Sequence, residues 1–175
     1  VKSLPATGEA YLVSFGGWQE RYKISLPSHG KMVWTTHATA CCSDLDAGGG
    51  NELVPGKWTH AAFVHDGTKD KIYVNGVLVA EKDSPGDLAY TVHPLGIGYD
   101  PIDVANYFNG SLDEVQIYNY AMTGTEITDL YNTQNTASIG PNPIVLNLPV
   151  SGDLEDVSQF KNDGQPADAD LTYDR

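Results

Sequence analysis

The pair Asn75-Gly76 is the strongest local folding signal in the sequence. It lies between two segments rich in apolar residues, Lys71-Ile72-Tyr73-Val74 and Val77-Leu78-Val79. Asparagine and glycine tolerate the left-handed backbone that a two-residue hairpin turn needs. The sequence therefore predicts two antiparallel strands joined by this turn.

Most other apolar runs are equally short and end at turn residues, which favours an antiparallel β-sandwich or barrel over a helical or α/β fold. The chain has 18 glycines and 10 prolines among 175 residues, and this length suffices for one domain with its own core. One helix is predicted near residues 123–132, because Thr123 or Thr125 can cap it and Ile127 shares an apolar face with Leu130. The remaining strands are predicted at residues 9–15, 20–26, 31–37, 57–64, 95–98, 109–119, 144–150 and 171–173.

The charge balance excludes two classes of partner. The chain has 23 acidic and 10 basic residues, which gives a net charge of −13. Such a chain repels nucleic acid and anionic membrane surfaces. No run approaches the roughly 18 apolar residues of a membrane-spanning helix, so no membrane insertion is expected.

Cys41 and Cys42 are the only cysteines, and they are adjacent. They are either two reduced thiols or a vicinal disulfide, which would require an oxidising compartment. Zinc does not fit, because adjacent thiols lack the spacing of zinc ligands. Both lie in a long loop predicted over residues 38–50, which also holds Asp44 and Asp46. Loops of this length in compact domains are usually functional or disordered.

Asp113 and Glu114 interrupt the predicted strand 109–119. Adjacent residues of a strand point to opposite faces, so one of the two carboxylates is expected to point inward. A buried carboxylate costs several kcal/mol unless a cation, an arginine or backbone donors compensate it.

Three stretches together resemble the laminin-G-like jelly rolls of the concanavalin A-like lectin/glucanase superfamily. They are Trp58-Thr59-His60 with His65-Asp66-Gly67 and Ile72–Gly76, then Leu95–Gly98 with Phe108–Asn119, and finally the helix with Glu126-Ile127 and Leu130-Tyr131. The resemblance implies an all-β fold, an antiparallel concanavalin A-like jelly-roll sandwich with one short helix.

The resemblance also divides the chain. Residues 1–135 resemble the main part of such a sandwich without its opening strands, and residues 136–143 resemble a linker. Residues 144–175 resemble the segment that opens such a domain. This segment could dock in the same molecule on residues 112–119 or belong to a following module, and the missing strands could come from a neighbouring copy.

A structural Ca²⁺ is the metal that the resemblance implies. Calcium takes hard oxygen ligands at about 2.3–2.6 Å from several loop segments. The matching positions are Asp113, Glu114, Gly152, Asp156 and Asn162. The alternative is that the acidic residues are solvated or pair with lysines.

Carbohydrate is the ligand that the resemblance favours. Sugar sites combine aromatic faces with polar hydrogen-bonding groups. The candidates are Trp18, Arg21, Cys41, Cys42, Asp44, Asp46, Tyr99, Asp100 and Tyr107.

The expected function is therefore a secreted or cell-surface binding and adhesion module, not an enzyme. Glucanases of the superfamily carry spaced carboxylates on one strand, and the sequence shows no such run. One alternative is a structural module that assembles with neighbouring copies of the same protein by strand exchange. Another is an accessory domain of a glycoside hydrolase.

Overall fold

A computed structural model of the chain describes residues 1–39, 42–133 and 144–148. The chain divides into two compact units. The first contains residues 1–111 and resumes at Met122 through helix α2, and the second contains residues 112–121 and the chain after residue 137.

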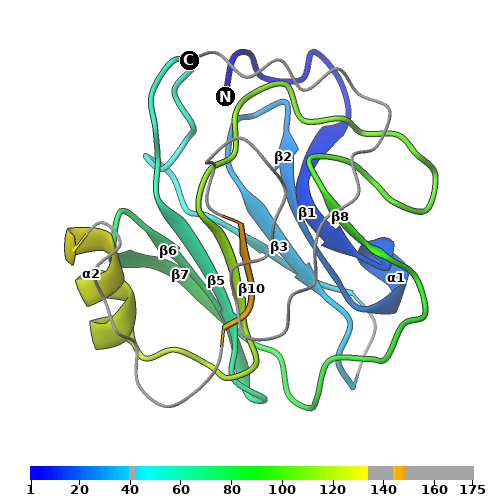
Figure 1. The fold of residues 1–175 in the computed structure, drawn as a ribbon, viewed down its shortest axis with the longest axis vertical. Coiled ribbons are helices and arrows are strands. Elements are labelled where there is room, and N and C mark those ends of the chain that lie inside the picture. Colours follow the sequence, from blue (N-terminus) through cyan, green and yellow to red (C-terminus); the bar gives the residue numbers. More distant parts are fainter. Residues whose placement is uncertain (40–41, 134–143, 149–175) are drawn as a thin grey trace. The chain divides into compact units, whose positions relative to one another are not determined.

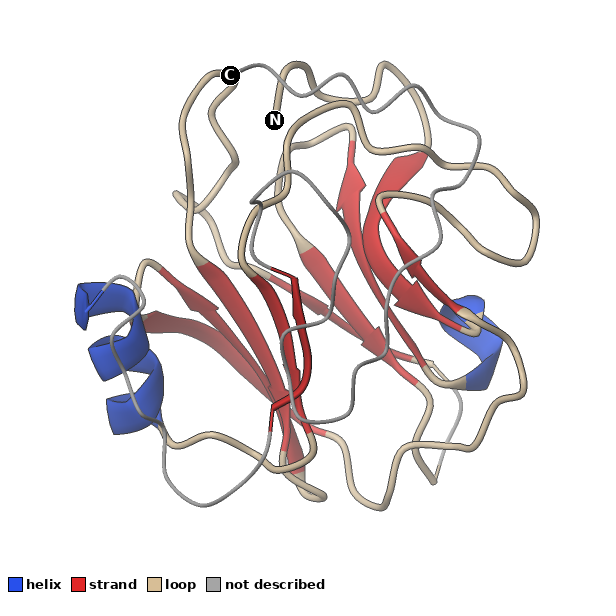
Figure 2. Ribbon diagram, in the orientation of Figure 1, coloured by secondary structure: helices blue, strands red, loops and turns tan. Residues whose placement is uncertain are grey.

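The first unit contains two antiparallel sheets (Figures 1 and 2). One has five strands in the order β4-β3-β2-β1-β8, and the other has three in the order β5-β6-β7. The expected fold class, an antiparallel β-sandwich, is confirmed. The strands are β1 (Glu9–Phe15), β2 (Tyr22–Pro27), β3 (Val33–Thr36), β4 (Ser43–Asp46), β5 (Ala61–His65), β6 (Lys69–Val74), β7 (Val77–Asp83) and β8 (Leu95–Ile97).

The core of this unit lies between the two sheets. Ile24, Trp34 and Leu45 are register partners on β2, β3 and β4. The Trp34 ring lies 5.8 Å from the ring of Phe63 on β5, so this row points towards the three-stranded sheet. Leu26 and Ile72 are fully buried. Because side chains alternate along a strand, the intervening residues of β2 to β4 point away from this core.

The predicted hairpin is present, and Val74 pairs with Val77 across it. Asn75 has φ 50° and Gly76 has φ 78°, the left-handed values that a two-residue hairpin turn requires. A Cβ at Gly76 would lie 3.0 Å from the Tyr131 ring, so this site also needs glycine for the close approach of helix α2.

Helix α2 (Gly124–Thr133) confirms the predicted helix. Its cap is reciprocal, because Thr123 N donates to Glu126 Oε2 (2.7 Å) and Glu126 N donates to Thr123 Oγ1 (3.3 Å). Thr128 Oγ1 donates to Gly76 O (2.9 Å), which fixes the helix against the β6–β7 hairpin. In the described part of the chain, no helix is both long and apolar enough to span a membrane.

The second unit contains β9 (Val115–Tyr118) paired antiparallel with β10 (Ile144–Leu148). The strand predicted over residues 109–119 is thus shorter than expected. Glu114 has φ 52°, which ends the extended backbone before Val115. The expectation that Asp113 and Glu114 alternate across this strand is therefore wrong. Residues 136–143 and 149–175 lie outside the described residues, so the interpretation of residues 144–175 as an opening segment stays a prediction.

Two short elements differ from the sequence prediction. Strand β4 lies inside the predicted loop 38–50, because Asp44-Leu45-Asp46 alternates one buried residue between two exposed ones. A short helix, α1 (Gly17–Glu20), which the sequence did not predict, connects the paired strands β1 and β2, and it follows a positive φ at Gly16. The predicted strand 171–173 lies outside the described residues.

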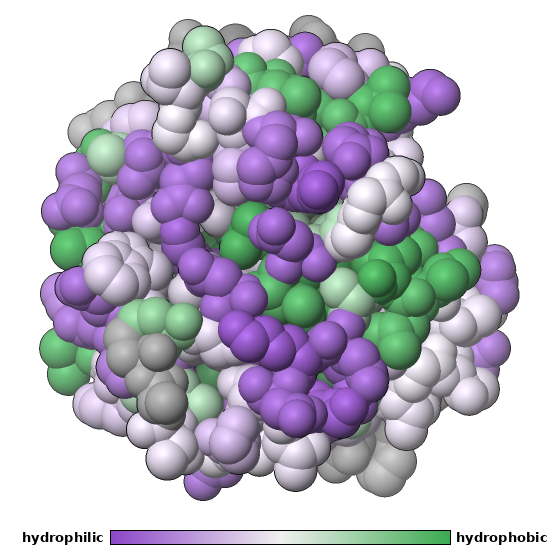
Figure 3. Space-filling model, turned by 180° about the vertical axis from the view of Figure 1, so that it is seen from behind, coloured by the Kyte–Doolittle hydropathy of each residue, from purple (hydrophilic) through white to green (hydrophobic). Residues whose placement is uncertain are grey.

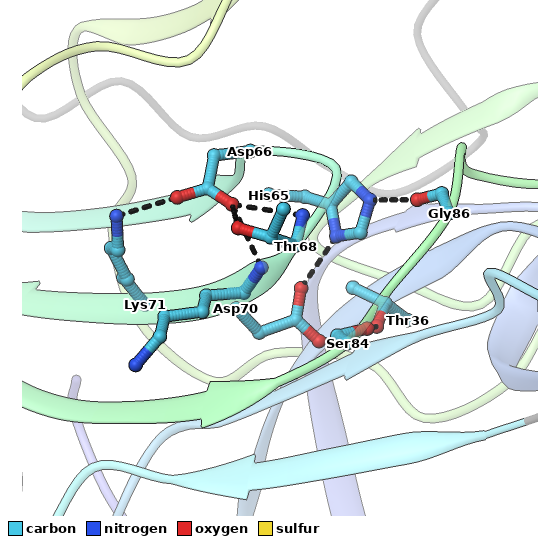
Figure 4. Close-up of polar contacts among 9 residues, drawn as sticks. Thr36, His65, Asp66, Thr68, Asp70, Lys71, Ser84 and Gly86 are labelled. Atoms are coloured by element: carbon cyan, nitrogen blue, oxygen red, sulfur yellow. Dashed lines mark hydrogen bonds and ion pairs between the residues drawn. The ribbon is translucent and has the colours of Figure 1, made fainter.

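A buried polar network joins the two sheets of the first unit (Figure 4). Asp70 on β6 is fully buried, and its Oδ2 accepts a hydrogen bond from Thr36 Oγ1 on β3 (2.5 Å). Its Oδ1 lies 2.8 Å from His65 Nδ1, while His65 Nε2 donates to Gly86 O (2.7 Å). A buried carboxylate is tolerated only when its lone pairs are used, and here two side chains use them.

We predict that Asp70→Ala lowers the free energy of unfolding by about 3 kcal/mol or more, because it leaves His65 and Thr36 buried without their acceptor. Urea denaturation followed by circular dichroism measures this. The matched control is Asp83→Ala, whose side chain is 86% exposed, and it should cost less than about 0.5 kcal/mol. Equal losses in the two variants would contradict a structural role for the network.

Candidate functional site

The outer face of the five-stranded sheet carries polar residues. Ser14, Lys23, Thr35 and Asp44 are register partners from β1 to β4. They alternate with the residues that point into the core, so they lie on the opposite face of the sheet. Ser14, Lys23 and Thr35 are buried, so Asp44 is the member of this row that a ligand can reach.

A second row crosses the same face and brings predicted residues together. Tyr107 pairs with Tyr11, and Tyr11 with Ser25. Val33 then lies between Ser25 and Asp46. Paired residues point to the same face of a sheet. The row covers four strand spacings, or about 19 Å, with an aromatic ring at one end and a carboxylate at the other.

An open hollow of about 400 Å³ lies on this face. Thr35 is buried at its floor, while Asp44 and Asp46 are exposed. The lining residues are Glu9, Lys23, Pro27, Val33, Thr35, Asp44, Leu45 and Asp46.

Lys23 is buried in this hollow and has two partners. Its ammonium forms an ion pair with Glu9 and lies 4.7 Å from the ring centre of Tyr11. Burial of Glu9 opposes its ionisation, but the hydrogen bond and the charge of Lys23, together with the hydroxyl groups of Ser25 and Tyr11, outweigh this and lower the pKa of the Glu9 carboxyl. Burial, together with the charge of Glu9, raises the pKa of the Tyr11 hydroxyl. Glu9 is thus ionised and neutralises Lys23.

The two aspartates of β4 differ in their contacts. Asp44 Oδ1 accepts a hydrogen bond from Thr35 Oγ1 (2.6 Å), and Lys82 Nζ lies 3.2 Å from the main-chain oxygen of Asp44. The Asp46 carboxylate makes no hydrogen bond or ion pair with any residue that the structure describes. Asp46 therefore has acceptor capacity for a ligand.

The segment 99–107 supplies the aromatic end of the site. The rings of Tyr99 and Tyr107 stack with centres 6.1 Å apart and planes 16° apart, and Tyr107 is 54% exposed. Asp100 is buried, and its Oδ1 accepts a hydrogen bond from Ile102 N (3.0 Å). Asp100 therefore shapes this segment, and Tyr107 is the residue that offers a free surface.

Three other predicted residues gather at helix α1 instead. Trp18 is 45% exposed, and its main-chain oxygen lies 3.7 Å from Cys42 Sγ. Arg21 donates to Ala89 O (2.8 Å) and lies over the Phe15 ring, so its guanidinium is used within the fold. Cys42 is disulfide-bonded, and Cys41 lies outside the described residues. The predicted ligand set thus falls into two groups.

Sequence reasoning missed Glu9, Lys23 and Thr35. The signal was present in β2, where Lys23 and Ser25 alternate with apolar neighbours. However, a polar side of a strand is usually solvated, and only the pairing with β1 and β3 brings these residues to one hollow.

Exposed hydrophobic side chains do not gather on one element. The most exposed are Tyr90 (83%), Val92 (81%) and Trp58 (70%), and others lie on α1, β7 and the segment 99–107. On the face seen in Figure 3, hydrophilic residues run through the middle of the surface between smaller hydrophobic groups.

The predicted calcium ligands are only partly described. Gly152, Asp156 and Asn162 lie outside the described residues, and Asp113 and Glu114 lie before β9 in the second unit. Within residues 1–39, 42–133 and 144–148, no group of three or more His, Cys, Asp or Glu residues could hold a metal ion. The calcium site stays a prediction.

Residues 1–128, well over half of the chain, match the model of a laminin-G-type family described as the concanavalin A-like lectin/glucanases superfamily. The chain belongs to this superfamily. The superfamily includes both lectins and glucanases, so membership leaves the choice between binding and catalysis to the site.

A solved structure from Bacteroides ovatus, described as a candidate carbohydrate-binding protein, matches with a TM-score of 0.65 and 18% identity. The match covers 86% of this chain and 43% of that one. An S-layer domain-containing protein from Clostridium thermocellum matches with a TM-score of 0.35 and 22% identity, over 73% of this chain and 65% of that one. This chain thus spans less than two thirds of each. A comparison with curated proteins finds no match.

We predict that Glu9→Gln lowers the free energy of unfolding at neutral pH by about 1 kcal/mol or more, because Lys23 loses a charged acceptor. The pKa of Glu9 is lowered by folding, so its contribution is complete above its ordinary value of 4.5 and is lost as pH falls further. Urea denaturation from neutral pH to below this value should show the two proteins converge in acid. A difference that does not change with pH would contradict the ion pair.

Proposed function

We propose that this chain is a non-catalytic carbohydrate-binding module and that its ligand lies on the outer face of the five-stranded sheet. The observation that carries the proposal is the row from Tyr107 to Asp46, whose two ends are exposed while the residues between them are buried under the same face beside the hollow. Its length of about 19 Å suits a chain of linked sugars rather than a single small molecule.

The residues of this face match the chemistry of a sugar. A pyranose ring has an apolar C–H face that packs on an aromatic ring, and Tyr107 offers such a ring. Its hydroxyl groups donate hydrogen bonds, and the carboxylates of Asp44 and Asp46 accept them. Thr35 holds Asp44 in place, so part of the site is ordered before the ligand binds.

The electrostatics of the face support binding rather than hydrolysis. A glycosidase needs a carboxylic acid whose pKa is raised so that it can protonate the leaving group. Glu9, the most buried carboxyl of the hollow, has a pKa shifted in the opposite direction. The ion pair with Lys23 keeps the Glu9 carboxylate ionised and already bound to a partner within the fold.

We also propose that the module works outside the cell, either secreted or at the cell surface. The disulfide at Cys42 supports this, because disulfides persist in oxidising compartments. Assembly with neighbouring copies by strand exchange stays a prediction. Size-exclusion chromatography of the purified chain tests it, because strand exchange would give an oligomer rather than a monomer.

The test of the proposed function is retention on immobilised polysaccharides, followed by titration calorimetry with oligosaccharides of those that bind. Tyr107→Ala should weaken binding about fivefold or more, because it removes a stacking surface worth about 1 kcal/mol. Tyr90→Ala is the matched control, since Tyr90 is 83% exposed and does not line the hollow. If no polysaccharide is retained, or if both variants bind equally well, the proposed function is wrong.

We further propose that a structural Ca²⁺ is held by Asp113 and Glu114 together with Gly152, Asp156 and Asn162. Hard oxygen ligands from separate segments are the set that calcium prefers. Calcium should raise the melting temperature by several degrees relative to a chelator-treated sample, by preferential binding to the folded state. Asp113→Asn should abolish the rise. If calcium leaves the melting temperature of the wild type unchanged, the proposed calcium site is wrong.

A further inference from the structure

We infer that the hollow selects its glycan by charge, accepting neutral and amine-bearing sugars and excluding sugars that carry carboxylate or sulfate groups. This inference rests on the proposed function and adds the chemical class of the ligand. The specificity-determining residues are Asp44 and Asp46.

The cation inside the hollow is not available to an acidic ligand. Lys23 is 7% exposed, and its ammonium contacts both Glu9 and the Tyr11 ring. An incoming carboxylate would have to displace Glu9, which would leave that charge partly buried without a partner. Recognition of acidic glycans normally uses accessible arginine or lysine groups, and no arginine among the described residues lines this hollow.

The remaining charge of the hollow is negative. Among the described residues that line it, three are acidic and one is basic. After Glu9 and Lys23 neutralise each other, Asp44 and Asp46 remain, and both are exposed on one strand. In the described part of the chain, one other cation contacts β4. It is Lys82 on β7, whose ammonium lies 3.2 Å from the main-chain oxygen of Asp44.

The position of the two carboxylates gives them a direct effect on the ligand. Asp46 is exposed and lines the hollow beside Asp44, so a sugar unit in the hollow lies against the Asp46 carboxylate. A hydroxyl or an ammonium group at that place donates to the carboxylate, whereas a second anion is repelled. The net charge of −13 adds a repulsive field over the whole chain.

The experiment compares three classes of glycan on one array. The probes are chitin oligosaccharides as neutral ligands, chitosan oligosaccharides as amine-bearing ligands, and hyaluronan, polygalacturonate and heparin as acidic ligands, together with neutral glucans and galactans. We expect retention of neutral or amine-bearing probes to exceed that of every acidic probe by about tenfold or more at low salt. Higher salt should narrow this difference, because it screens the repulsion.

The variants assign the selectivity to the hollow. Asp44→Asn with Asp46→Asn keeps the shape and the hydrogen-bonding capacity while removing both charges, so it should raise retention of acidic probes about threefold or more and reduce the preference for chitosan. Asp83→Asn with Asp87→Asn is the matched control, because both residues are exposed and neither lines the hollow. It also removes two charges, but elsewhere, and should leave the ratio unchanged.

The outcomes separate the two claims. If acidic probes bind best and Tyr107→Ala weakens them, the charge inference is overturned while the proposed function stands. If the double variant of the hollow and the control variant Asp83→Asn with Asp87→Asn change the ratio equally, the selectivity comes from overall charge, and the assignment to Asp44 and Asp46 is overturned. Retention of no probe of any class overturns both claims.

Discussion

The packing of Trp34 against Phe63 is the contact on which the arrangement of the site depends. It sets which side of the five-stranded sheet faces the core, and because side chains alternate, it also places Lys23, Thr35 and Asp44 on the other side. A slip of one residue would exchange the two faces. The buried contact of Asp70 with Thr36 reinforces the same register from the opposite sheet, because a shifted β3 would remove the threonine from its acceptor.

The outer face shows how a charged residue can be buried next to a binding surface. Lys23 lies at the centre of this face, where an unpaired ammonium would be costly. Glu9 and the Tyr11 ring compensate it within the sheet itself. The ion pair of Lys23 with Glu9 therefore stabilises the sheet rather than binding a ligand. The groups that remain available to a ligand are the Tyr107 ring at one end of the row and the Asp46 carboxylate at the other.

The parts of the fold that sequence could predict are those with local signals. The turn at Asn75-Gly76 and the cap between Thr123 and Glu126 involve residues within a few positions of each other. Strand β4 was not predicted, because a single apolar residue, Leu45, does not give enough alternation to distinguish a strand from a loop. Among the predicted ligand residues, Asp44, Asp46 and Tyr107 reach the outer face, but Glu9 and Lys23 come from a pairing between separate strands, which no local pattern encodes.

The central claim is that a glycan binds along the outer face of the five-stranded sheet. Chemical-shift mapping by NMR, with the ¹⁵N-labelled chain and an oligosaccharide retained on the array, tests this residue by residue. The account predicts the largest shifts along β1 to β4 and at Tyr107, with small ones at helix α1 and around Tyr90. Shifts concentrated at Trp18 and Tyr90, with the outer face unchanged, would contradict it.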